Sequence, residues 1–562
     1  MCRGTASSSI AGLAGIMAAL VVFGTASAQP GTVLSNQKIS DTAGNFTAII
    51  DNLDELGGAV AHLGDLDGPG PSVSALAIGA PLDDDGGTDR GAVYILFQDA
   101  AGMTLSHQKI SETVNLPGAP LDNTDAFGSA LAFLGDLDGP GPSVAALAIG
   151  SIGDDDGGGA RGAVYIVFLS TSGTVLSLQK ISNTAGNFTA TLDNDDEFGG
   201  ALASLGDLDG VGPSVHSLAV GVVGDDDGGT NRGAVYVLFL AASGSVSSHQ
   251  KISSTQGNFA GPLDLGDSFG SAVSTLGDLD GGGPSVLALA ASAVLDDDGG
   301  TDRGAVYVLF LNATGTVRSQ QKISDTHGNF GGVFDNLDEF GSSIAHLGDL
   351  DGPGGTVATM LVGVSGDDDG GEDRGAVHIL FVNADGACAS SLKISDLAGN
   401  FPPPLDNLDG FGTAVAYLGD LDGPGPSTAA LAVGAGGDDD GGTDRGAAYI
   451  LFLDGVSVVG IAPTRGPTGV GALSRPWPNP FRPSSTIPYR LAEDAEVRID
   501  VWDLRGRRVR RLFSGRVSAG EHQAVWDGRD DAGQALPTGT YFYRMTIDGR
   551  PAERSEKAVL VR

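Results

Sequence analysis

Residues 83–97 read DDDGGTDRGAVYILF, and this stretch decides the fold because close copies of it recur along the chain. Its Asp-Asp-Asp-Gly-Gly element begins at residues 83, 154, 225, 296, 367 and 438, always 71 residues apart. A second element, Gly-Asp-Leu-Asp-Gly, begins at residues 64, 135, 206, 277, 348 and 419 with the same spacing. Six units of 71 residues fill residues 31–456, so the sequence predicts a repeat architecture.

Each unit contains four runs with the composition of β-strands, separated by turn residues. In the first unit these runs are residues 56–63, 73–78, 92–97 and 104–110. The third run is apolar on both faces, as expected for a strand between neighbouring sheets. The first run is rich in Gly and Ala, which suits a crowded strand nearest an axis. We therefore predict an all-β fold, a closed β-propeller of six four-stranded blades over residues 29–456.

The two ends of the repeat array predict how the ring closes. The sixth unit stops after residues 447–453 and lacks a fourth strand. Residues 32–40, at the front, have the phase of that missing strand. We expect the two segments to pair, because this pairing closes the ring and removes a long exposed edge.

The charge of the chain excludes a protein built to hold nucleic acid, since 31 Lys+Arg stand against 70 Asp+Glu, a net charge of −39. Residues 457–562 carry 17 Lys+Arg and 12 Asp+Glu, or +5, so residues 1–456 carry 14 and 58, or −44. Six of those 14 cations are the Lys of a repeated Lys-Ile-Ser motif. Six more are arginines that follow the Asp-Asp-Asp loops, and we expect them to pair within those loops: Arg90, Arg161, Arg232, Arg303, Arg374 and Arg445.

A four-stranded blade sorts the acidic residues onto two faces. Loops between strands one and two form a first face with those between strands three and four. Loops between strands two and three form a second face with the connections between blades. The Gly-Asp-Leu-Asp-Gly loops belong to the first face, and residues 83–85 with Asp51, Asp54 and Glu55 belong to the second. Both faces therefore carry rings of carboxylates, which repel one another unless cations or arginines neutralise them.

The N-terminus has the pattern of a signal peptide over residues 1–28. Arg3 precedes an apolar run, residues 10–23, and Ala26-Ser27-Ala28 forms an A-x-A cleavage site. The run is shorter than the roughly 20 residues that span a bilayer, and no later segment approaches that length. We expect a protein that is secreted or held at the outer cell surface, with no transmembrane segment in the mature chain.

The repeat resembles the FG-GAP repeat of the integrin alpha-subunit propeller and its bacterial relatives. Phe127-Gly128 opens the first strand of the second unit, and Gly79-Ala80-Pro81 supplies a literal Gly-Ala-Pro. Phenylalanine stands in the same phase in the later units: Phe198, Phe269, Phe340 and Phe411. The integrin propeller has seven blades, whereas this chain has six units.

The resemblance implies calcium, which FG-GAP loops bind through Asp-x-Asp-x-Asp-Gly-x-x-Asp. The third ligand position lacks a carboxylate here, since it holds Pro, Val or Gly, and the final Asp of the motif is displaced. Backbone carbonyls and waters would have to complete the site. The alternative is a tight turn in which the aspartates cap backbone amides. The Asp-Asp-Asp loops are a second, weaker candidate for calcium. The matching first and second positions are Asp65, Asp67, Asp136, Asp138, Asp207, Asp209, Asp278, Asp280, Asp349, Asp351, Asp420 and Asp422.

A different domain follows the repeats. Residues 457–475 have the composition of a linker, and residues 476–562 show short alternating strands typical of a small β-sandwich. Asn479-Pro480-Phe481, residues 503–507, Trp526-Asp527-Gly528 and residues 537–541 are similar to the Ig-like domain of flagellar hook-capping proteins and to type IX secretion sorting domains. The resemblance implies recognition by export machinery.

No catalytic constellation repeats with the units. Only two pairs of histidines share a phase, His62 with His346 and His107 with His249. We expect a non-catalytic exported protein that binds an extracellular protein or glycan. The alternatives are an enzyme or enzyme subunit with a site in the axial channel, and a purely structural envelope component.

Overall fold

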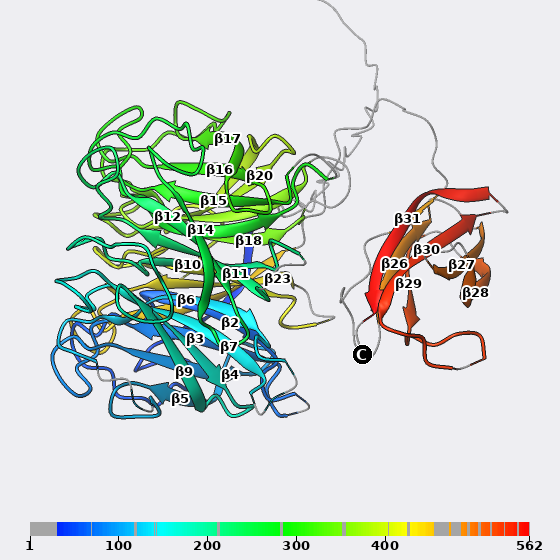
Figure 1. Cartoon of the computed structure of the whole chain (residues 1–562), viewed down its shortest axis with the longest axis horizontal. Coiled ribbons are helices and arrows are strands. Elements are labelled where there is room, and N and C mark those ends of the chain that lie inside the picture. Colours follow the sequence, from blue (N-terminus) through cyan, green and yellow to red (C-terminus); the bar gives the residue numbers. More distant parts are fainter. Residues whose placement is uncertain are drawn as a thin grey trace, which may run out of the picture. The chain divides into compact units, whose positions relative to one another are not determined.

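The computed structural model describes residues 31–454 and 471–560, apart from short gaps. It divides into two compact units, Met1–Val458 and Val459–Arg562, each described by itself (Figure 1). All elements of the described part are β-strands, and none of it forms a helix able to cross a membrane. The predicted signal peptide, residues 1–28, lies outside the described residues. The gaps are residues 69, 117, 119–120, 140, 142, 211–213, 282–284, 351–355, 403, 424–426, 474–484, 492–494, 504–506, 518–519, 533 and 548–549.

The first unit consists of six four-stranded antiparallel sheets, one for each sequence repeat. The first sheet runs in chain order through β2 (Ala59–Gly64), β3 (Ser74–Ala80), β4 (Ala92–Gln98) and β5 (Thr104–Ile110), so the four predicted strands are confirmed. The next four sheets have the same order and contain β6 (Phe127–Gly135), β7 (Ala145–Ser151), β8 (Ala163–Leu169), β9 (Val175–Ser182), β10 (Ala201–Gly206), β11 (His216–Val222), β12 (Ala234–Leu240), β13 (Val246–Ile252), β14 (Phe269–Gly277), β15 (Leu287–Ala293), β16 (Ala305–Leu311), β17 (Val317–Ile323), β18 (Phe340–Gly348), β19 (Ala358–Val364), β20 (Ala376–Val382) and β21 (Cys388–Ile394).

The sixth sheet is assembled from both ends of the repeat array. It has the order β1 (Val33–Ile39), β24 (Ala447–Asp454), β23 (Ser427–Ala435) and β22 (Val415–Gly419). β1 pairs antiparallel with β24, with Val33 opposite Leu453. This confirms the predicted pairing, which covers the edge of β24 with the first strand of the chain.

Apolar packing joins the six sheets into a propeller-like ring. Each pair of neighbouring sheets shares one buried cluster, and the cluster that holds Tyr94 and Leu96 also holds Ile450 of the sixth sheet. The first strand of every blade contacts its counterparts in the neighbouring blades, as its small residues predict. A Cβ atom on Gly79 would lie 2.1 Å from the carbonyl oxygen of Gly128 in the next blade, so glycine permits this close approach.

The second unit is a two-sheet sandwich with an Ig-like arrangement. One sheet has the order β25 (Gly471–Leu473), β26 (Ser485–Leu491) and β29 (Gly520–Trp526). The other has the order β28 (Arg508–Val517), β27 (Ala495–Asp503), β30 (Gly539–Ile547) and β31 (Arg550–Leu560). Their facing side chains form one core around the fully buried Trp526, whose Nε1 donates to the carbonyl of Arg529 at 2.9 Å.

The predicted linker, residues 457–475, extends too far at its C-terminal end. Residues 471–473 form β25 and pair with β26 of the sandwich. Composition misled here because a three-residue edge strand with Gly and Ala has no periodicity to distinguish it from a linker. Residues 457–470 and 474–475 lie outside the described residues.

The closing strand offers a direct test of ring closure. Ile39 of β1 is fully buried, so Ile39→Ala should lower the free energy of unfolding by about 2–5 kcal/mol. Leu34→Ala, on the same strand but 43% exposed, should change it by at most about 0.5 kcal/mol. Urea unfolding measures both values, and equal effects would contradict a closed ring held by β1.

Candidate functional site

A lysine on the fourth strand pairs with two carboxylates of the Asp-Asp-Asp loop in every blade. In the first blade the Lys109 ammonium lies 2.8 Å from an oxygen of Asp83 and 2.6 Å from one of Asp85. The first aspartate of each loop is buried and the third is partly exposed. The other five blades repeat the arrangement at 2.5–2.9 Å: Lys180 with Asp154 and Asp156, Lys251 with Asp225 and Asp227, Lys322 with Asp296 and Asp298, Lys393 with Asp367 and Asp369, and Lys38 with Asp438 and Asp440.

Further polar groups hold each lysine in place. Tyr94 donates its hydroxyl to Asp83 at 3.1 Å, and the ammonium of Lys109 lies 5.3 Å from the tyrosine ring centroid. Burial alone would lower the pKa of Lys109, but hydrogen bonds and charge from Asp83 and Asp85 raise it above its usual value. The lysine is therefore a resident cation in the loop.

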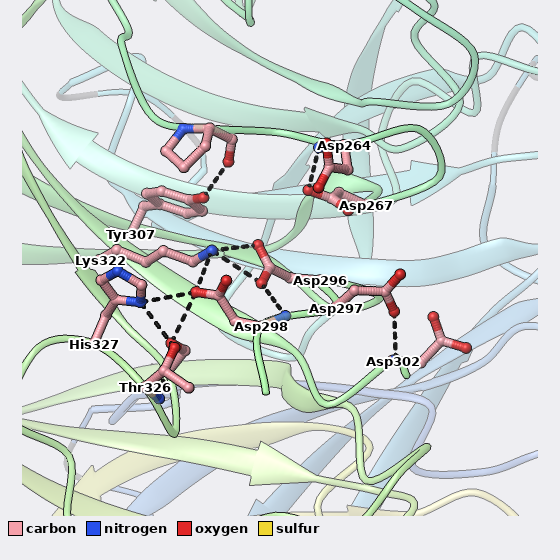
Figure 2. A network of polar contacts seen from close by, with 12 residues as sticks. Asp264, Asp267, Asp296, Asp297, Asp298, Asp302, Tyr307, Lys322, Thr326 and His327 are labelled. Carbon is pink, nitrogen blue, oxygen red and sulfur yellow. Dashed lines mark hydrogen bonds and ion pairs between the residues drawn. The ribbon is translucent and has the colours of Figure 1, made fainter. Parts of the chain in front are cut away.

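Figure 2 shows the corresponding network in the fourth blade. Lys322 lies between Asp296 and Asp298, and His327 contacts Asp298 at 2.9 Å. Tyr94, Tyr165 and Tyr449 donate to the first aspartate of their loops, whereas Tyr307 donates to the carbonyl of Pro262 at 2.6 Å. Because the lysine ammonium bridges two of the three loop carboxylates, the position that calcium would need in these loops is already filled.

The arginines that follow these loops do not pair within them, which corrects the sequence-based expectation. Arg445 instead reaches the connection that leads to the next blade, with Nη1 2.6 Å from Asp41 and Nε donating to Asn52 at 3.0 Å. Arg303 and Arg374 repeat both contacts, Arg90 pairs with Glu112 and Asn123, and Arg161 keeps only the asparagine contact, to Asn194. The first and third carboxylates of each loop are already paired with lysine. Except for Arg232, whose buried Nε has no hydrogen-bond partner among the described residues, these arginines therefore tie neighbouring blades together.

A second buried carboxylate recurs in the connection before each blade. The sequence placed Asp54 on the second face but did not predict its burial. Asp54 is 3% exposed, and one of its oxygens accepts the backbone N–H of Asp51 at 2.7 Å. Burial, together with the nearby charge of Asp83, raises the pKa of Asp54 to about 7. The recurrence of an aspartate at this position every 71 residues was the signal in the sequence that could have identified it. The equivalents have pKa values raised to about 7 for Asp125, Asp338 and Asp409, and to about 6 for Asp196 and Asp267.

The predicted calcium residues lie in the first-face loops directly after the innermost strands. Asp65 is exposed, and Asp67 accepts the hydroxyl of Ser72 at 2.5 Å. Partial burial, and then the neighbouring Asp67, raise the pKa of Asp65. The pKa values of Asp136, Asp207 and Asp420 are raised in the same way, by burial and then by their partners Asp138, Asp209 and Asp422.

These loops offer at most two carboxylates each. In the described part of the chain, no group of three or more His, Cys, Asp or Glu side chains is arranged to hold a metal ion. Asp278, Asp280 and Asp349 occupy the equivalent loops of the fourth and fifth blades, while Asp351 lies outside the described residues. Calcium in the first-face loops therefore stays a prediction that rests on paired carboxylates.

The C-terminal sandwich matches a known domain family. Residues 483–549 match the FlgD Ig-like domain. This agrees with the two-sheet topology and with the resemblance to hook-capping proteins. No curated protein matches the chain.

Comparison with solved structures gives only distant likenesses. PorZ of Porphyromonas gingivalis, described as a surface component of the type-IX secretion system, is 12% identical, with a TM-score of 0.33 over 87% of this chain and 58% of PorZ. FlgD from P. aeruginosa is 22% identical, with a TM-score of 0.13 over 17% of this chain and 75% of FlgD. PorU of P. gingivalis is 13% identical, with a TM-score of 0.16 over 69% of this chain and 36% of PorU. At such scores these likenesses carry no argument.

Removing one resident lysine should destabilise the ring. Lys322→Met leaves the buried Asp296 without its cation, so we expect a loss of about 3 kcal/mol in the free energy of unfolding. Arg318→Met changes an exposed cation on the same strand and should cost at most about 0.5 kcal/mol. Urea denaturation compares the two, and a loss of similar size in both would show that the lysine is dispensable.

The buried carboxyls predict an unusual pH dependence. The pKa of Asp54, about 7 in the fold, exceeds that of an unfolded Asp, so stability falls as pH rises from about 4 to about 7. The melting temperature should therefore increase from pH 8 to pH 5. Below about pH 4 it should fall again, because lysine charge and hydrogen bonds outweigh burial and lower the pKa of Asp85.

A single neutral variant isolates the effect. Asp54→Asn keeps an oxygen for the Asp51 amide but removes the buried charge, so it should stabilise the ring by about 1–2 kcal/mol at pH 8. The gain should vanish at pH 5. Calorimetry at both pH values measures the stability of the variant. If the variant is less stable than the unchanged chain at pH 8, the fold does not favour an uncharged side chain at this position.

Proposed function

We propose that the chain is an exported, non-catalytic protein whose ring binds an extracellular protein or glycan, either at the outer cell surface or after secretion. The observation that carries the proposal is the sixfold repetition of charged loops on a rigid ring. Repeated, identically oriented sites favour multivalent binding, because each additional contact forms at high effective concentration.

The C-terminal sandwich supports the export part of the proposal. Its match to the FlgD Ig-like domain and its similarity to sorting domains favour a role as the segment that export machinery recognises. The separate compact unit suits such a role, since it can be recognised without disturbing the ring. The signal-peptide pattern of residues 1–28 supports passage across the inner membrane first.

Calcium is proposed for the first-face loops in keeping with the FG-GAP resemblance. Asp65 and Asp67 would supply two carboxylate ligands, with backbone carbonyls and water completing the shell. Burial and then the charge of Asp67 raise the pKa of Asp65, and a bound cation would relieve the second of these effects. Two carboxylates per site favour weak binding, with a Kd of about 10⁻⁴ to 10⁻³ M.

Calcium titration tests the metal assignment. The chain should bind calcium in that range, and replacing the first aspartate of all six loops with Asn should abolish binding. The six are Asp65, Asp136, Asp207, Asp278, Asp349 and Asp420.

Asp99→Asn is the matched control, because Asn312 holds the same turn in the fourth blade. It should leave calcium binding unchanged. If the chain still binds calcium after all six aspartates are replaced, its calcium sites do not lie in these loops.

Surface labelling of intact producing cells tests the location. The full chain should be labelled or released into the medium, whereas a chain lacking residues 476–562 should be retained inside. If both chains are exported equally, the C-terminal sandwich is not the segment that the export machinery recognises.

A further inference from the structure

Three cavities recur on the second face, at the same place in the first three blades. Their volumes are about 440 Å³ in the first and third blades and about 240 Å³ in the second. Each is lined by the connection that precedes the blade, by the Asp-Asp-Asp loop and by the fourth strand. His107 and His249, the histidines that share a repeat phase, line the two larger cavities, and Leu178 lines the smaller one.

All three cavities carry a surplus of negative charge. Five aspartates and one lysine line each of them. In the first blade Lys109 is already bound to Asp83 and Asp85. No described cation pairs with the remaining three, Asp51, Asp54 and Asp84.

The buried member of each group has an unused acceptor. Asp54 accepts one hydrogen bond, from the Asp51 amide, and no described residue donates to its other oxygen. Asp125 and Asp196 are equally buried and also accept a single bond. Because Asp54, Asp125 and Asp196 line their cavities, a hydrogen-bond donor that enters a cavity can reach this second oxygen.

The lining distinguishes the kind of cation that fits. Calcium takes six to eight oxygen ligands, whereas the described carboxylates nowhere converge in groups of three. An ammonium group donates three hydrogen bonds and needs only a few acceptors. The rings of Tyr94 and His107 and the side chains of Ala48 and Ile49 also line the first cavity and suit the carbon framework that carries the ammonium.

We propose that these cavities bind a primary ammonium group, with the Asp54-type carboxylate at the buried end and the exposed Asp51 and Asp84 at the opening. A lysine side chain and an amino sugar both carry this group. That the ammonium belongs to the extracellular partner rests on the proposed function, whereas binding in the cavity does not. The partner would then occupy several equivalent cavities around the ring.

Calorimetric titration of the purified full chain at pH 7 and low salt tests the proposal. Nα-acetyl-lysinamide and glucosamine are the probes, and their N-acetylated counterparts on the reactive amine are the neutral controls. The amines should bind, the neutral compounds should not, and high salt should weaken binding. Binding should also release protons, because a nearby cation lowers the pKa of the buried carboxyl. A preference for one of the two amines would separate a protein source from a glycan source.

A triple variant locates the binding. Asp54, Asp125 and Asp196 changed together to Asn should weaken amine binding at least about tenfold. The matched control changes Asp89, Asp302 and Asp444 to Asn, removing the same charge from the same face. Asn231 already occupies the equivalent position in the third blade with the same left-handed backbone, so the control should fold and bind normally.

Three results would overturn the proposal: no amine binding by the unchanged chain, equal loss in both triple variants, or displacement of the amine by 1 mM calcium. Melting temperatures confirm that each variant folds. If amines bind the cavities but the ring binds no cells or envelope material, the proposed function fails and the cavity assignment stands.

Discussion

The ion pair between the fourth-strand lysine and the Asp-Asp-Asp loop is the interaction on which the ring depends. Three successive carboxylates, the first of them buried, require a cation at close range. That cation comes from the last strand of the blade, so the loop is neutralised only when all four strands are in register. In the sixth blade Lys38 belongs to β1 and pairs with Asp438, 400 residues away. Closing the ring and neutralising its last loop are therefore the same event.

Repulsion between carboxylates is compensated differently on the two faces of the ring. On the second face, lysines neutralise the loops and arginines such as Arg445 tie each blade to the following connection. On the first face, burial and then the neighbouring Asp67 raise the pKa of Asp65. We infer that the first face draws its cations from solution. The second face also buries the Asp54-type carboxyl of each blade, which is the origin of its expected sensitivity to pH.

The sequence predicted the strands, the blade number and the closing pair, because a fixed 71-residue period carries all three. It failed for Arg90, whose partners Glu112 and Asn123 lie in the next repeat. Pairing between repeats depends on how the blades pack. A motif within one unit carries no information about that packing. Asp54 was placed on the correct face, but its raised pKa was not predicted for a related reason, since that pKa follows from burial. The short β25 strand lacked any pattern to mark it.

We propose that the ring binds its partner through its second face. Hydrogen–deuterium exchange of the full chain, with and without envelope fractions of the producing cells, tests this most directly. We expect added protection from exchange in the Asp-Asp-Asp loops and in the connections between blades. High salt should reduce this protection. Protection confined to the Gly-Asp-Leu-Asp-Gly loops, or none in either face, would contradict it.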